Sequence, residues 1–285
     1  MNQYLEFVKP TYIENWPKEL ARLTFAQTGL PLSRGEMVTL GGANIEFGEI
    51  LRESYGKPSV AARDGLIQRM DEAIRLYPKG CFVRLGSRSP KDSMWIYEHG
   101  AQCGDGMQAW NCLTGCSERM HDDLSIALAE EYQAWIWCRQ WVDMEPDEEF
   151  RCFQRGGDLI AISQYDYLNK AHYPKIVQNA SGITWAIGQW YYGSEFRRDV
   201  GMKDVILDVR CARREAGNQA VYETTLVEIN PFFDMTDPCL FSWPLKVEPV
   251  EFRFRGAPDE NGAGQIMRMI GCGEAELVQE SSTPK

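Results

Sequence analysis

Two polar residues interrupt an otherwise apolar segment at residues 226–231, which reads LVEINP. Glu228 and Asn230 are two positions apart, so a β-strand would place both side chains on the same face. A carboxylate and an amide oxygen side by side suit a hard cation such as Mg²⁺. A half-exposed strand that ends at a proline turn accounts for the same residues, so this segment alone leaves both interpretations open.

A further oxygen ligand lies in the preceding strand. Asp208 belongs to DVILDVRC, and the turn REAGNQ joins this segment to the strand of Glu228 and Asn230. The two strands form a predicted hairpin in which two acids and an amide converge on one point. Mg²⁺ usually keeps several waters and takes phosphate oxygens, so three protein ligands suffice and a nucleotide is the natural companion. We expect these side chains to project into a wet cleft.

Two arginines are candidates for the phosphate side of such a site. Arg84 lies within the apolar strand FVRLGS, and Arg151 lies within EFRCF. A charge in such a strand is costly unless it is paired, and the guanidinium is well shaped for phosphate. An edge or surface position is the alternative for Arg84.

The polar loop GSRSPKD follows Arg84 and could close over a triphosphate. It offers backbone N–H groups together with Ser87, Ser89, Arg88 and Lys91. The loop lacks the Gly-Lys-Ser/Thr spacing of a Walker A motif. We expect it to be mobile without nucleotide, because it has little to bury.

These candidates need a scaffold of hairpins and helices. Leu66, Met70, Ile74 and Tyr77 recur at helical spacing, which predicts a helix over 62–77 that ends at PKG. The pattern also predicts strands at 81–87, 93–97, 134–142 and 250–256, hairpins over 149–167 and 204–232, a mostly helical segment at 172–198, and a frayed polar tail at 273–285. The predicted fold class is α+β, with largely antiparallel sheets and helices beside them.

The composition narrows the class of protein. The 285 residues include 44% hydrophobic and 25% charged residues, as in ordinary globular proteins, and carry a net charge of −11. Nucleic acid is therefore an unlikely partner. We expect a cytoplasmic protein with free thiols, because the N-terminus lacks a signal-peptide pattern, no apolar run reaches membrane length, and the nine cysteines form no regular framework.

The order of these features resembles the ATP-grasp fold, in which ATP lies between two antiparallel sheets from two α+β subdomains. Several segments narrow the resemblance to the cell division cycle protein 123 family. They occur in order over roughly residues 11–245 and read NWPKELARLTFAQTGLPL, FVRLGSRSPKDSMWI, HDDL, EFRCFQRGGDLIAISQYDY and EINPFFDMTDPCLFSW.

The resemblance implies a site for ATP or ADP with Mg²⁺. Its implied catalytic residues are Arg84 and Arg151; the nucleotide-binding set adds Ser87, Ser89, Lys91, Arg139, Gln140 and Trp141; and the implied metal ligands are Asp208, Glu228 and Asn230. The family usually has Lys at position 84 and Asp at position 228, and both replacements keep the charge.

The resemblance also implies a division of the chain. It gives an N-terminal region (1–80) packed on the core, a small subdomain with the phosphate-covering loop (81–140), a large subdomain with the metal site (141–250), and a C-terminal strand and tail (251–285).

Two functions are compatible with this site. The first is an ATP-binding, chaperone-like assembly factor, since family members assemble translation initiation factor two. The alternative is an ATP-grasp ligase or ATPase, in which a small carboxylate substrate forms an acylphosphate that an amine displaces, by positioning and charge neutralisation.

Overall fold

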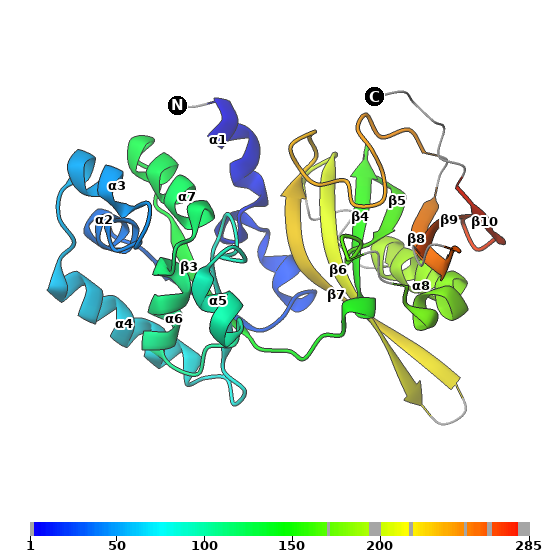
Figure 1. Ribbon diagram of the computed structural model, residues 1–285, viewed down its shortest axis with the longest axis horizontal. Coiled ribbons are helices and arrows are strands. Elements are labelled where there is room, and N and C mark those ends of the chain that lie inside the picture. Colours follow the sequence, from blue (N-terminus) through cyan, green and yellow to red (C-terminus); the bar gives the residue numbers. More distant parts are fainter. Residues whose placement is uncertain are drawn as a thin grey trace. The chain divides into compact units, whose positions relative to one another are not determined.

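The chain folds as two compact α+β units. The computed structural model describes residues 3–169, 172–193, 201–216, 219–247, 250–260 and 264–278 (Figure 1). One unit comprises Met1–Trp16 with Phe25–Asp143, and the other comprises Pro17–Thr24 with Met144–Lys285. The end of the predicted helix at 194–198, the turn at 217–218 and the tail at 279–285 lie outside the described residues.

The first unit, which we call unit 1, contains a three-stranded antiparallel sheet in the order β1-β3-β2. Its strands are β1 (Gln27–Pro31), β2 (Cys81–Leu85) and β3 (Trp135–Gln140). Its helices are α1 (Gln3–Val8), α2 (Arg34–Gly42), α3 (Gly48–Tyr55), α4 (Val60–Ile74), α5 (Met94–His99), α6 (Gly106–Thr114) and α7 (Glu118–Ala129), with short 3₁₀ turns η1 (Lys9–Thr11) and η2 (Ile13–Asn15).

The predicted helix over 62–77 is confirmed as α4. Ser59 caps it by accepting a hydrogen bond from the backbone N–H of Ala62. Its predicted apolar face is buried, since Leu66, Met70 and Ile74 are each at most 2% exposed. This face packs in one core with the inward side chains of β2 and β3.

The predicted strand at 93–97 is wrong, because these residues begin helix α5. A short apolar run such as SMWIY has no period that separates strand from helix. A tertiary contact and a local contact favour the helix: Ser93 Oγ donates to the carbonyl of Gly115, and the rings of Trp95 and His99 stack one helical turn apart. The polar loop therefore joins a strand to a helix, and no hairpin forms.

The second unit, which we call unit 2, contains a seven-stranded sheet in the order β10-β9-β8-β5-β4-β6-β7. The two predicted hairpins are confirmed as β4–β5 and β6–β7, and β8 pairs in parallel with β5. The strands are β4 (Glu149–Arg155), β5 (Asp158–Gln164), β6 (Val205–Ala216), β7 (Gln219–Pro231), β8 (Glu251–Pro258), β9 (Gly264–Ile270) and β10 (Ala275–Leu277); the helices are η3 (Lys18–Arg22), η4 (Pro146–Glu148) and α8 (Pro174–Gly193).

Part of the segment expected to fray is a strand. Residues Ala275–Leu277 form β10, which pairs with β9 through Met269, Arg268 and Met267. The side chains of β10 are exposed, so its sequence has no hydrophobic period that would predict a strand. The strand forms because its backbone pairs with β9.

The two faces of this sheet have different covers. Helix α8 packs on one face against β5, β6, β7 and β8 (Figure 1). On the other face, Phe153 and Ile206 pair across β4 and β6 and pack against Phe241 and Leu245 from the segment that follows β7. Within the part of the chain that the structure describes, no helix has the length and apolar character needed to cross a bilayer.

The N-terminal segment is anchored on unit 1 at the end of β2. The backbone N–H of Ile13 donates to the carbonyl of Gly86, and the neighbouring Glu14 carboxylate accepts from Tyr132 Oη at 2.8 Å and Trp137 Nε1 at 3.2 Å. A Cβ at position 86 would lie 1.6 Å from Oε2 of Glu14, so a larger residue there would displace this carboxylate.

Replacing Gly86 by alanine should therefore destabilise unit 1. The added Cβ displaces the Glu14 carboxylate from its two donors, and we expect the free energy of unfolding to fall by about 1–3 kcal/mol. Urea unfolding followed by tryptophan fluorescence measures the change. The control is Gly65→Ala within α4, where a Cβ has nothing within 4 Å and alanine should add about 0.5–1 kcal/mol. An unchanged midpoint for Gly86→Ala would contradict this close contact.

Candidate functional site

One face of the three-stranded sheet carries two of the predicted nucleotide-binding arginines. Arg84 pairs with Trp137 across β2 and β3, and Arg139 pairs with Phe82. Paired residues point to the same side of a sheet, and alternate residues point to opposite sides. Val83 and Cys138, the intervening pair, point into the helical core. The structure thus brings Arg84 and Arg139 together on the face that is turned away from that core.

This face is rich in aromatic surface. The rings of Trp135 and Trp137 stack with centroids 5.9 Å apart and planes 18° apart. The opposite residue on β1 is Gly29, where a Cβ would lie 2.8 Å from the Trp137 ring, so glycine makes room for the indole. Cationic and aromatic side chains on one surface provide the chemistry that a purine nucleotide requires.

Arg84 is buried and folded back on its own loop. Its Nε donates to the carbonyl of Leu85 at 2.9 Å, and Nη2 donates to the carbonyl of Ser87 at 3.3 Å. Because only 3% of Arg84 is exposed, its charge depends on nearby acceptors, and these contacts fix the guanidinium at the C-terminal end of β2.

Glu14 is the carboxylate of this region, and sequence reasoning missed it. Burial raises the pKa of its carboxyl group, while hydrogen bonds from its own backbone, Tyr132 and Trp137 and the charge of Arg84 partly oppose that shift. Glu14 lies in a 3₁₀ turn, and Arg84 comes 70 positions later in the sequence. No local pattern therefore indicates that the two charges lie near each other.

The loop expected to cover a triphosphate is attached to helix α7. Arg88 Nε donates to Asp123 Oδ1 at 2.8 Å, and Asp92 accepts from Ser117 Oγ at 2.6 Å and from the backbone N–H of Arg119. Ser89 is buried, whereas Lys91 is exposed. Asp123 therefore already pairs with Arg88, a loop cation that we expected phosphate to bind.

The remaining predicted residues of unit 1 lie at the end of β3. Gln140 follows Arg139, so strand alternation points it to the opposite side, and it is exposed. Trp141 Nε1 donates to Asp143 Oδ1 at 3.0 Å. Gln140 therefore does not share the face of Arg84 and Arg139, and Trp141 lies beyond the last residue of β3.

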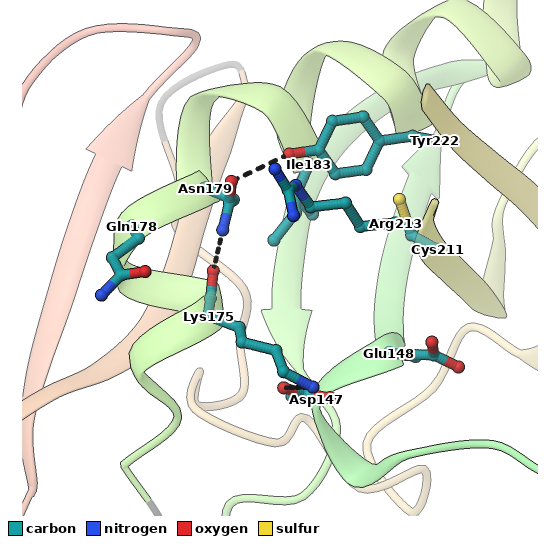
Figure 2. A pocket seen from close by; sticks show the side chains of 9 residues that line it. All are labelled: Asp147, Glu148, Lys175, Gln178, Asn179, Ile183, Cys211, Arg213 and Tyr222. Carbon is teal, nitrogen blue, oxygen red and sulfur yellow. Dashed lines mark hydrogen bonds and ion pairs between the residues drawn. The ribbon is translucent and has the colours of Figure 1, made fainter. Parts of the chain in front are cut away.

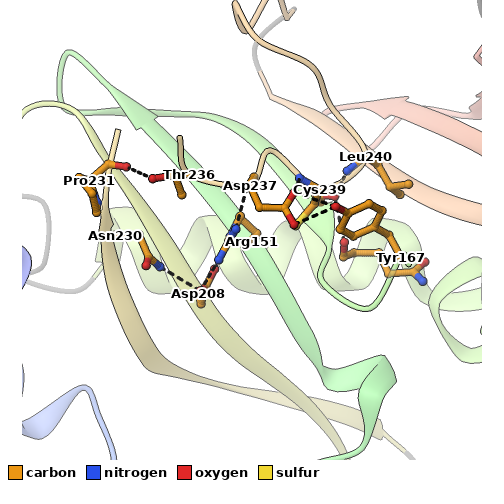
Figure 3. Close-up of polar contacts among 11 residues, drawn as sticks. Arg151, Tyr167, Asp208, Asn230, Pro231, Thr236, Asp237, Cys239 and Leu240 are labelled. Carbon is orange, nitrogen blue, oxygen red and sulfur yellow. Dashed lines mark hydrogen bonds and ion pairs between the residues drawn. The ribbon is translucent and has the colours of Figure 1, made fainter. Parts of the chain in front are cut away.

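In unit 2, Arg151 and Asp208 form a buried ion pair across β4 and β6 (Figure 3). Arg151 Nε and Nη2 each donate to one Asp208 oxygen at 2.8 Å, a bidentate geometry. Only 6% of Arg151 and 1% of Asp208 are exposed. Burial disfavours the charge of Arg151, but the adjacent carboxylate raises its pKa well above the ordinary value.

The predicted metal ligands adjoin this ion pair. Asn230 Nδ2 donates to Asp208 Oδ2 at 3.0 Å, and Glu228 is the cross-strand partner of Asp208, beside a bulge. The expectation that all three project into a wet cleft is wrong for Asp208, which is buried because Arg151 neutralises it. Glu228 and Asn230 are half-buried.

The donor set suits a hard cation in part. The Glu228 carboxylate and the Asn230 amide oxygen are ligands of the type that Mg²⁺ prefers. Both Asp208 oxygens already accept hydrogen bonds from Arg151, so Asp208 has less capacity for a metal. Among the described residues, no three His, Cys, Asp or Glu side chains are grouped as metal ligands, so any site here depends on the amide.

Sequence reasoning also missed Asp237 and Tyr167, which extend the cluster. Arg151 Nη1 donates to the backbone carbonyl of Asp237 at 2.6 Å, and Tyr167 Oη lies 2.8 Å from the Asp237 carboxylate (Figure 3). The turn sequence TDP around Asp237 was the available signal, but a turn residue gives no indication of a partner 86 positions away.

Comparisons with known proteins place this geometry in context. The D123 family model matches residues 53–270. The translation initiation factor eIF2 assembly protein of Danio rerio is 28% identical over 185 residues, which cover 61% of this chain and 50% of that protein. Cell division cycle protein 123 of Eremothecium gossypii is 28% identical over 170 residues, covering 56% of this chain and 44% of that protein. The chain thus spans about half the length of the curated relatives it matches.

The fold is similar to that of a solved structure. The structure of Cdc123 from Schizosaccharomyces pombe superposes with a TM-score of 0.63 at 22% sequence identity, covering 84% of this chain and 94% of that chain. This similarity supports the α+β architecture described above.

Asp208→Asn should destabilise unit 2 strongly, because it leaves the buried Arg151 charge without its counter-charge. We expect a loss of about 3–5 kcal/mol in the free energy of unfolding. Glu228→Gln on the paired strand is the matched control and should lose less than about 1 kcal/mol. The double variant Arg151→Met/Asp208→Leu removes both charges and should recover most of the loss. Equal, small losses for Asp208→Asn and Glu228→Gln in thermal and urea unfolding would contradict the structural role of Asp208.

Glu14→Gln should change how stability depends on pH. The raised pKa of Glu14 means that the folded protein binds this proton more tightly than the unfolded chain does. The wild type therefore loses stability relative to the variant as the pH rises above about 4.5. Melting temperatures of both proteins between about pH 4 and about pH 7 test this; a difference that does not depend on pH would show that Glu14 titrates normally.

Proposed function

Because this chain belongs to the D123 family, we propose that it is an ATP-binding, chaperone-like assembly factor that acts on a protein client of the translation-initiation-factor kind. The membership that the motifs predicted is confirmed by the family model, which spans residues 53–270. This one observation carries the proposal, because the match includes every predicted nucleotide and metal residue from Arg84 to Asn230.

We propose that the nucleotide binds as in ATP-grasp proteins. The sheet face with Arg84, Arg139 and the stacked Trp135–Trp137 pair supports this, because it combines cations for phosphates with aromatic surface for a base. Arg84 would hold phosphate oxygens by exchanging its weaker contact, the 3.3 Å hydrogen bond to the Ser87 carbonyl. Ser87, Ser89 and Lys91 belong to the adjoining loop, and we propose that its backbone and Lys91 contribute to the same phosphates.

We further propose that Glu228 and Asn230 would hold Mg²⁺, with Asp208 beside them. Bound Mg²⁺ would neutralise charge on phosphate oxygens. The chain's own contribution is positioning: Arg151 fixes Asp208, and Asp208 accepts a hydrogen bond from the Asn230 amide, which orients the amide oxygen. Arg151 uses three N–H groups within the protein, so its role in this scheme is to position its neighbours.

The client part of the proposal comes from the relatives. Several of the matching relatives are named translation initiation factor eIF2 assembly protein, including the Danio rerio and Xenopus tropicalis proteins. An assembly factor needs a nucleotide-dependent surface and no acceptor substrate, whereas a ligase needs both a carboxylate and an amine in its site. We therefore expect nucleotide to control client binding.

Calorimetry with ATP tests the nucleotide site. The wild type should bind ATP in millimolar Mg²⁺ and more weakly without it. Arg84→Met should weaken binding about tenfold, or about 1.4 kcal/mol, whereas Lys79→Met, which removes an exposed cation paired with Asp143, should leave it unchanged. Glu228→Gln should reduce the Mg²⁺ dependence. Absence of ATP binding in Mg²⁺ would overturn the proposed function.

Two further measurements separate an assembly factor from a ligase. Pull-down of purified eIF2 subunits with and without ATP should show nucleotide-dependent capture. Phosphate release from ATP that requires a small carboxylate together with an amine, and is unaffected by eIF2 subunits, would favour the ligase.

A further inference from the structure

A pocket of about 280 Å³ lies in unit 2 between helix α8 and the β6–β7 hairpin (Figure 2). Asp147, Lys175, Cys211 and Arg213 are among the residues that line it. Cys211 and Asp208 are three positions apart on β6, so strand alternation points them to opposite faces of the sheet. The pocket is therefore separate from the Arg151–Asp208 cluster and belongs to no part of the proposed nucleotide site.

The pocket contains a buried acceptor that the protein leaves unsatisfied. The Asp147 side chain is only 10% exposed, and its Oδ1 atom is buried with no hydrogen-bond partner. Its other oxygen has only a long contact, 3.4 Å, with Nζ of Lys175, whose side chain is 75% exposed. A buried carboxylate oxygen without a donor is costly, so this end of the pocket favours a ligand that brings a cationic N–H group.

The neighbouring acid, Glu148, already has a cationic partner. Glu148 Oε2 accepts from Arg210 at 2.7–2.8 Å, so its charge is already paired. Burial raises the pKa of the Cys211 thiol to about 12, so this side chain is a neutral wall of the pocket. At this end of the pocket, Asp147 Oδ1 is therefore left without a donor, while Lys175 Nζ lies 3.4 Å from Oδ2 of the same carboxylate.

The other end of the pocket presents donors. Figure 2 shows the Arg213 guanidinium beside the Tyr222 hydroxyl, away from Asp147. Arg213 and Tyr222 are cross-strand partners. Arg213 pairs with Glu215, but their side chains are 44% and 63% exposed, and such a solvated pair exchanges readily for a ligand anion.

The chain is built so that Tyr222 can reach this position. Its hydroxyl donates to Asn179 Oδ1 at 3.2 Å on α8. A Cβ at Gly182, one helical turn further along, would lie 2.7 Å from the same hydroxyl. Glycine at position 182 thus allows the Tyr222 ring to lie against helix α8.

We propose that this pocket binds a small zwitterion of the size of an α-amino acid, with its ammonium group on Asp147 and its carboxylate on Arg213. A ligand that carries both charges supplies a donor to the Asp147 carboxylate and can replace the exposed Glu215 partner of Arg213. The volume suits a small organic molecule, and Ile183 supplies an apolar contact between the two ends.

Ligand variation tests the charge pattern. The twenty common amino acids, each at about 10 mM and therefore in excess over a millimolar Kd, are screened by thermal shift, and the best one is titrated by calorimetry. Its N-acetyl derivative lacks the cation and its carboxamide lacks the anion; each should bind at least about tenfold more weakly. Failure of all twenty to raise the melting temperature, or equal binding of either derivative, would overturn the proposal.

Protein variants test the residues. Asp147→Asn and Arg213→Gln should each weaken binding at least about tenfold. Both should still fold, because Asp147 loses only a long contact and Arg213 only an exposed ion pair. The matched control is Glu223→Gln, which breaks the exposed pair with Arg214 outside the pocket and should leave affinity unchanged. Undiminished binding by Asp147→Asn would place the ligand elsewhere. ATP affinity should be unchanged in all three variants, so this result is independent of the nucleotide proposal.

Discussion

The bidentate ion pair between Arg151 and Asp208 is the interaction on which unit 2 depends. It places two full charges at 6% and 1% exposure on neighbouring strands of a seven-stranded sheet, where burying either charge alone would be strongly unfavourable. The same guanidinium holds the Asp237 carbonyl, and the same carboxylate accepts from Asn230. One pair of side chains thus connects β4, β6, β7 and the segment that covers this face of the sheet.

A comparable constraint organises unit 1 around a buried carboxylate. Glu14 joins the N-terminal segment to Trp137 of β3 and to Tyr132, which precedes this strand, and a Cβ at position 86 would displace its carboxylate. Arg84 lies close enough for its charge to lower the cost of burying Glu14. The arginine predicted to bind phosphate therefore belongs to a preorganised group of acid, indole and backbone carbonyls. Preorganisation of this kind reduces the cost of ordering a binding site.

The two faces of the large sheet separate structural from binding roles. One face is closed by aromatic side chains over Phe153 and by the ion pair, and it leaves Glu228 and Asn230 half-buried at its edge. The other face is covered by α8, and the pocket beside this helix is lined by Asp147, whose Oδ1 atom has no hydrogen-bond partner. The pocket proposed for a zwitterion therefore lies apart from the residues of the proposed nucleotide site.

The sequence by itself determined the family, the α+β class, helix α4, and the β4–β5 and β6–β7 hairpins, because period, turn residues and motif order are local properties. It also marked Arg84, Arg151, Asp208 and Asn230 as unusual, since charged and amide groups in apolar strands need partners. Only the tertiary structure decided which residues are those partners. Arg151 neutralises Asp208, Asp123 pairs with Arg88, and Glu14 lies near enough to Arg84 to be affected by its charge. It also decided that Met94–His99 is helical and Ala275–Leu277 a strand. These outcomes depend on contacts between residues far apart in the chain, and no local pattern carries that information.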